Sequence, residues 1–135
     1  MDKDLVRFSY EGLNFEGISE GGIRTSIVCS SLNIMFDIGN FPVNTINVDK
    51  LFLTHGHLDH AAGIPYYISQ RSLRHLSPPK IFIPKYMEEP LREILNLYQR
   101  LEGFEYQYQL VPIELDTYEA INSFHFVKAL KTHHR

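Results

Sequence analysis

The stretch that decides the fold runs from Leu51 to Gly63 and reads LFLTHGHLDHAAG. It opens with a short apolar run, which is typical of a strand that is buried on both faces. Three histidines and one aspartate then fall within six residues, namely His55, His57, Asp59 and His60. Because site residues gather at the carboxyl ends of strands, this loop is the first candidate for chemistry.

The spacing of these side chains suits metal ions. Zinc accepts imidazole nitrogen and carboxylate oxygen. Residues at i and i+2 of an extended chain point the same way, so His55 and His57 can chelate one ion. Asp59 and His60 begin the turn into a helix, so we expect them to face a point next to the ion that His55 and His57 share. The pattern therefore predicts two ions side by side, which can clamp the oxygens of a displacement and acidify a bridging water.

Two further points concern the same loop. We expect Gly56 to remove a Cβ that would crowd the tight turn. A surface histidine cluster without a function is the alternative interpretation, because 7 of the 135 residues are histidine. At these residue frequencies His-x-His-x-Asp-His arises by accident in about one such chain in a thousand, so the metal-site interpretation is favoured.

Length and composition predict one globular domain without a membrane span. The chain has 135 residues, of which 44% are hydrophobic and 21% charged, and it can bury one core. No apolar run is long enough to cross a membrane, and the first residues lack the apolar segment of a secretory signal. Cys29 is the only cysteine, so we expect a reducing cytoplasm. The net charge of −3 does not by itself indicate nucleic-acid binding.

The order of predicted elements places several strands before strand–helix–strand units. Turns at the glycines between Glu11 and Gly22 separate short strands near the N-terminus. Residues 25–30 and 32–37 predict two paired strands, the second of which ends at Asp37. A helix is predicted from about Ala61 to Arg74, and residues 81–83 predict a further strand.

The rest of the chain predicts one more helix and two strands. Five apolar residues recur at helical spacing before a stop at Gly103, and we interpret them as core packing. They are Leu91, Ile94, Leu95, Tyr98 and Leu101. Residues 104–110 alternate as a half-exposed strand does, and a last strand begins near Phe124 and continues to the C-terminus. The whole pattern predicts an α/β fold with sheet and helices packed in layers.

The run THGHLDH, residues 54–60, resembles the signature loop of the metallo-β-lactamase fold, an αββα sandwich. Three other segments narrow the resemblance to the short form of ribonuclease Z, the endonuclease that removes the 3′ trailer from precursor tRNA. They are SLNIMFDIG (31–39), PPKIFIPK (78–85) and VKALKTHH (127–134). The resemblance extends from about Gly12 to the last residue and implies the N-terminal half of that sandwich.

The resemblance also implies a role for each site residue. His55 and His57 would bind a first zinc ion, with His134 as its third protein ligand. Asp59 and His60 would bind a second zinc ion, and Asp59 would accept a proton from the attacking water; manganese is the alternative metal. In a strand His133 and His134 point to opposite faces, so we expect only His134 to face the loop.

Asp37 resembles an aspartate that lies just outside the metal ligands and orients one of them. A strand-end residue that accepts hydrogen bonds from turn amides explains Asp37 equally well. Five of the seven metal ligands of the family are present before the chain stops at Arg135. We therefore expect residues 1–135 to be one domain that is incomplete at the C-terminus, a half or a truncated copy of a longer protein, and inactive alone.

The leading hypothesis is a zinc-dependent phosphodiesterase that in its complete form acts on precursor tRNA in the cytoplasm. The resemblance further implies a homodimer. Another hydrolase of the same superfamily, acting on an ester, thioester or lactam, is the enzymatic alternative. A non-catalytic remnant that binds metal weakly or serves as a subunit is the alternative from another class.

Overall fold

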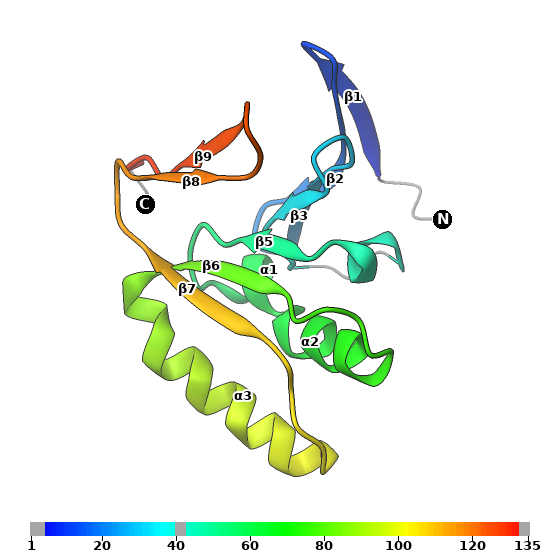
Figure 1. Ribbon diagram of the computed structural model, residues 1–135, viewed down its shortest axis with the longest axis vertical. Coiled ribbons are helices and arrows are strands. Elements are labelled where there is room, and N and C mark those ends of the chain that lie inside the picture. Colours follow the sequence, from blue (N-terminus) through cyan, green and yellow to red (C-terminus); the bar gives the residue numbers. More distant parts are fainter. Residues whose placement is uncertain (1–4, 40–42, 133–135) are drawn as a thin grey trace.

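The fold is a seven-stranded sheet with helices packed against it (Figure 1), seen in a computed structural model that describes residues 5–39 and 43–132. The strands lie side by side in sequence order. They are β1 (Val6–Tyr10), β2 (Leu13–Glu20), β3 (Arg24–Cys29), β4 (Ile34–Phe36), β5 (Lys50–Phe52), β6 (Lys80–Pro84) and β7 (Gln109–Ile113). Pairing is antiparallel from β1 to β4 and parallel from β4 to β7. The predicted α/β fold is confirmed.

Helices and short turns connect the parallel strands. They are η1 (Val43–Asn47), α1 (Leu58–Ala61), α2 (Ile64–Leu73), η2 (Lys85–Met87) and α3 (Glu88–Glu102). After β7 the chain forms a separate hairpin of β8 (Tyr118–Ala120) and β9 (Phe126–Lys128). Figure 1 shows α2 and α3 on one side of the parallel strands and this hairpin on the other. Among the described helices, none is long and apolar enough to cross a membrane.

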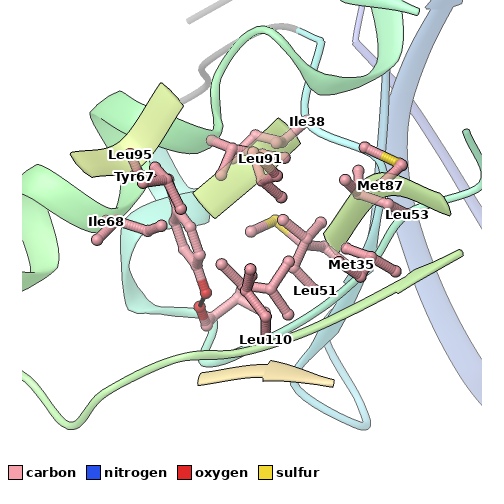
Figure 2. Close-up of a cluster of buried hydrophobic side chains, with 14 of the residues drawn as sticks. Met35, Ile38, Leu51, Leu53, Tyr67, Ile68, Met87, Leu91, Leu95 and Leu110 are labelled. Carbon is pink, nitrogen blue, oxygen red and sulfur yellow. Dashed lines mark hydrogen bonds between the residues drawn. The ribbon is translucent and has the colours of Figure 1, made fainter. Parts of the chain in front are cut away.

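The core lies mainly between the sheet and the helices. Figure 2 shows Tyr67 and Ile68 of α2 and Leu91 and Leu95 of α3 gathered with apolar residues of the sheet. β5 is buried on both faces, as its sequence predicts: Leu51 belongs to this cluster, and Phe52 to a second cluster on the opposite face. Burial of each side chain of this kind contributes about 1.5–3 kcal/mol to the stability of the fold. β5 is therefore firmly held at the point where residues 54–60, the histidine loop, begin.

A buried tyrosine fixes α2 against the segment before β5. The Tyr67 hydroxyl donates a hydrogen bond to the carbonyl oxygen of Val48. Burial raises the pKa of Tyr67 far above its ordinary value, so the hydroxyl keeps the proton that it donates. The helix α2 is thereby connected to the segment that leads into β5.

The predicted helix from Ala61 to Arg74 is divided in two. α1 ends at Ala61, and α2 begins at Ile64 after Gly63. The Gly63 N–H donates 2.8 Å to the carbonyl oxygen of Ile38, at the end of β4. This contact turns the chain toward β4 and interrupts the helix, which the apolar spacing could not reveal.

The predicted strand over residues 104–110 is wrong in its position, because β7 spans Gln109–Ile113. The alternation itself is real, since Tyr106 is buried and Phe104 and Tyr108 pack against the core. The Tyr106 N–H, however, donates 2.7 Å to Gln99 Oε1, and the Gln107 N–H donates 3.1 Å to Ser72 Oγ. Side chains of the two helices thus take the backbone hydrogen bonds that a neighbouring strand would use.

The interpretation of the α3 apolar residues as core packing holds for only two of them. Leu91 and Leu95 are buried, but Ile94, Tyr98 and Leu101 are 46%, 44% and 80% exposed. The helix itself begins and ends as expected, with Gly103 in the left-handed conformation at its C-cap. One side of α3 therefore presents apolar side chains that are partly or largely exposed.

Two predictions for the ends of the chain also need correction. Gly17 lies inside β2, paired with Ile27, and not in a turn. Within the described part of the chain, which ends at residue 132, the last strand spans Phe126–Lys128, and it pairs with a strand that the sequence did not predict, β8. His133 and His134 lie outside the described residues, so their strand parity and the role of His134 stay predictions.

Candidate functional site

The histidine loop leaves the sheet at the carboxyl ends of the parallel strands β4, β5 and β6. The Leu53 N–H donates 2.8 Å to the carbonyl oxygen of Phe82, which extends the pairing of β5 with β6 to the edge of the loop. His57 then occupies the N-cap position of α1, whose first turn contains Asp59 and His60. The four candidate ligands therefore lie at the edge where sites form in parallel sheets.

The carboxylate of Asp37 joins the end of β4 to this loop. Its Oδ1 accepts a hydrogen bond of 2.8 Å from the Thr54 N–H, and its Oδ2 accepts one of 2.8 Å from the Thr54 hydroxyl. The Nδ1 of His60 lies 2.8 Å from the same Oδ2. Asp37 thus accepts a hydrogen bond from a turn amide and also contacts a candidate ligand, which are the contacts that the two interpretations of this residue expect.

Proton counting assigns the tautomers of two histidines. An ionised carboxylate only accepts hydrogen bonds, so His60 must donate through Nδ1–H. The Thr54 hydroxyl spends its one proton on Asp37, and His55 Nδ1 lies 2.9 Å from its oxygen. His55 must therefore also donate through Nδ1–H. In their neutral forms both histidines present an Nε2 without a proton, which is the form that binds metal.

The first pair of candidate ligands is already close to the spacing that one ion requires. His55 Nε2 and His57 Nδ1 are 3.1 Å apart, and their ring centroids are separated by 4.6 Å. Two nitrogens at 2.0–2.1 Å from a tetrahedral zinc ion would lie about 3.3 Å apart. The donor set and its spacing therefore fit an ion shared by these two histidines.

The second pair shows a similar spacing. His60 Nε2 and Asp59 Oδ2 are 3.4 Å apart, and the side chains are 21% and 17% exposed. The ring of His60 also lies next to that of His55, with 4.2 Å between centroids. All four predicted residues with a described position are thus brought together. They form two adjacent pairs, although no group of three or more possible ligands is arranged to hold one ion within residues 5–39 and 43–132.

Gly39 is a site residue whose role the sequence does not reveal, since it follows the end of the predicted strand 32–37 and has no functional side chain. A Cβ on Gly39 would lie 1.6 Å from the carbonyl oxygen and 2.2 Å from the carbonyl carbon of Asp59. The neighbouring Ile38 N–H donates 2.7 Å to the carbonyl oxygen of His60. The backbone after β4 therefore runs directly against the backbone of Asp59 and His60, the second pair of candidate ligands, and only glycine fits.

The expected crowding at Gly56 is wrong. A Cβ built on Gly56 would lie 3.5 Å from both Met87 Cε and Tyr86 Oη, which is ordinary van der Waals contact. Gly56 is also absent from the residues with positive φ in the described chain. The tight position in this site is Gly39, a close approach between distant segments that local sequence does not show.

The two glycines make a matched pair for mutation. Gly39→Ala should lower the free energy of unfolding by about 3 kcal/mol, because a backbone carbonyl must move to admit the methyl group. Gly56→Ala should change it by less than about 1 kcal/mol, since its methyl group meets only ordinary contacts. Chemical denaturation of the complete protein measures both, and equal losses in the two variants would contradict this account.

Thr54 is the second residue whose role the sequence left unassigned. Thr54→Val keeps the shape but removes the hydroxyl that links His55 to Asp37, so we expect metal affinity to fall about tenfold. Thr54→Ser retains the hydroxyl and should stay close to wild type. Competition with a zinc-binding dye measures the affinities. An unchanged affinity in the valine variant would show that the link does not orient His55.

Comparisons with known proteins place the chain in a family. The family model described as Anti-Pycsar protein Apyc1 matches residues 27–135. The nuclear ribonuclease Z of Triticum aestivum is 37% identical over 132 residues, which are 98% of this chain and 75% of that protein. Two proteins of Arabidopsis thaliana, a chloroplastic tRNase Z and another tRNase Z, are 38% and 37% identical over 92% of this chain. The chain spans only 35% and 44% of their lengths. It therefore belongs to the ribonuclease Z family, as its sequence predicts, and its residues 27–135 to the family of the Anti-Pycsar protein Apyc1.

Proposed function

We propose that the complete protein is a metal-dependent phosphodiesterase that removes the 3′ trailer of precursor tRNA. The observation that carries the proposal is the pairing of His55 with His57 and of Asp59 with His60 beside the buried carboxylate of Asp37. The relatives named ribonuclease Z and tRNase Z support the substrate class. Because the chain covers only part of each relative, the activity belongs to the whole protein.

In this proposal His55 and His57 hold one ion, Asp59 and His60 hold a second, and His134 completes the first set. Imidazole nitrogen with one carboxylate suits zinc best, and manganese is the alternative. Bound ions of this kind supply Lewis acidity and lower the pKa of a water molecule. The chain itself contributes orientation: hydrogen bonds to Thr54 and Asp37 hold the rings of His55 and His60 through Nδ1, and each Nε2 faces the other member of its pair.

Asp59 has the second task of accepting the proton of the attacking water. Its side chain is 17% exposed, so the carboxylate is in contact with solvent. Its Oδ2 lies 3.4 Å from His60 Nε2, which keeps it beside the other ligand of the second ion. A carboxylate in this position acts mainly in the transition state, where the proton moves, and contributes little to the ground-state binding of RNA.

Asp59→Ala should therefore lower kcat about a thousandfold or more while the dissociation constant for RNA changes by less than about threefold. Cleavage of a labelled precursor tRNA by the complete protein measures kcat, and Glu105→Ala provides an exposed carboxylate as the control. Near-normal kcat in the Asp59 variant would contradict its role. Turnover of a lactam or thioester without cleavage of bis(p-nitrophenyl) phosphate would instead favour the other hydrolases of the superfamily.

We further propose that the protein is a homodimer and that the exposed side of α3 forms the contact. Ile94, Leu97, Tyr98 and Leu101 line a groove of about 750 Å³ that reaches Leu58 beside the histidine loop. Contiguous apolar surface of this kind is unusual on a monomer. In a dimer with twofold symmetry the same surface serves both partners, so one patch is sufficient.

Charge placed in this groove should separate the two copies. The double variant Leu97→Glu, Leu101→Glu would bury two carboxylates in an apolar contact, so we expect it to sediment as a monomer while the wild type sediments as a dimer. Asn96→Glu adds a charge on α3 outside the groove and should remain dimeric. Sedimentation equilibrium of the complete proteins measures the masses, and a monomeric wild type would contradict the proposal.

For the compartment we keep the cytoplasm as our proposal, supported by a single cysteine that is buried and unpaired. The names of two relatives refer to the nucleus and the chloroplast. Fluorescence imaging of the tagged complete protein tests the assignment, and exclusive accumulation in an organelle would contradict it.

A further inference from the structure

A second contact that fixes the histidine loop comes from a residue outside the loop. The Gly56 N–H donates a hydrogen bond of 3.0 Å to the hydroxyl oxygen of Tyr86. Tyr86 belongs to η2, which directly follows β6. Gly56 is the residue between His55 and His57, so this hydrogen bond acts on the backbone that connects the two nitrogens of the first pair.

The residue next to Tyr86 anchors it in the core. Met87 is 6% exposed and belongs to the main hydrophobic cluster, where Figure 2 shows it in the same group as Leu53 and Leu91. β6, the strand before η2, pairs with β5, the strand before the loop. The backbone at Tyr86 is therefore fixed relative to the loop, and its hydroxyl forms a firm support although the side chain is 66% exposed.

The hydrogen bonds of Asp37 and of Tyr86 act on different parts of the loop. The hydrogen bonds of Asp37 reach the ring of His60 directly and the ring of His55 through Thr54. The Tyr86 hydroxyl instead holds the peptide group that joins His55 to Gly56. A change in the tilt of that peptide would move His57 Nδ1 relative to His55 Nε2, and their present separation is 3.1 Å.

We propose that Tyr86 is a positioning residue, which sets the spacing of His55 and His57 for one metal ion through its hydrogen bond to Gly56. The inference rests on the proposed function only in that it concerns the same pair of ligands. Metal binding tests it without any assay of RNA cleavage, so the two proposals can fail separately.

The experiment compares two Tyr→Phe variants of the complete protein. Tyr86→Phe removes the oxygen that accepts from Gly56. Tyr98→Phe is the control: Tyr86 and Tyr98 both line the groove along α3. The structure records no hydrogen bond between the Tyr98 hydroxyl and any described residue. Titration with Co²⁺ gives the affinity, and the visible absorption of bound Co²⁺ reports the geometry of its ligands. We expect about tenfold weaker binding and an altered spectrum for Tyr86→Phe, and no change for Tyr98→Phe.

A second measurement follows the hydrogen bond itself in the metal-free protein. Amide exchange at Gly56 should be faster in Tyr86→Phe than in the wild type and in Tyr98→Phe. Equal Co²⁺ affinity and spectrum in all three proteins would overturn the inference, as would unchanged exchange at Gly56 or a wild type that binds no Co²⁺. Co²⁺ binding that depends on Tyr86, in a protein that leaves precursor tRNA intact, would support the inference and remove the proposed function.

Discussion

The carboxylate of Asp37 is the group on which the arrangement of the site depends. The residue is only 3% exposed, and a buried carboxylate costs several kcal/mol unless hydrogen bonds replace its water. Both donor residues, Thr54 and His60, belong to the histidine loop. If the loop moved away, the buried carboxylate would lose these hydrogen bonds and the folded state would be destabilised. The φ of +60° at Asp37 is a conformation that few residues other than glycine adopt. The chain thus turns sharply at the end of β4 and is held there by the contacts of this carboxylate.

Backbone contacts make the same connection a second time. Ile38 donates to the carbonyl oxygen of His60 and accepts from the N–H of Gly63, so the segment after β4 is hydrogen-bonded to the C-terminal part of α1 and to the residue just before α2. This approach is possible because Gly39 has no side chain. Side-chain and backbone contacts therefore fix the position of α1, and with it Asp59 and His60, from one neighbouring strand. The division of the predicted helix at Gly63 is a consequence of this connection and not a local preference of the sequence.

Sequence identified the candidate ligands because their spacing is local, but it could not identify the contacts that position them. His55, His57, Asp59 and His60 stand within six residues, whereas Gly39 matters only because Asp59 lies against it in space. Periodicity had the same limit. The alternation of residues 104–110 is real, and Tyr106 is buried, yet the alternation could not show that Gln99 would accept the hydrogen bond of the Tyr106 amide. Apolar spacing likewise predicted the extent of α3 but could not say that Leu101 would be left uncovered.

The spacing of the ligand pairs has a consequence for how a metal ion would be bound. Separations of 3.1 Å and 3.4 Å are already close to the distance of about 3.3 Å between two ligands of a tetrahedral ion. Rings that need little movement lose little rotamer freedom on binding, and each ordered side chain otherwise costs about 0.5–1.5 kcal/mol. Contacts from the end of β4 and from η2 order most of these side chains when the protein folds, so less rotamer freedom remains to be lost when a metal ion binds. The loop is short and follows the buried strand β5. Contacts from the neighbouring segments after β4 and after β6 are therefore sufficient to hold its four polar side chains close together at the edge of the sheet.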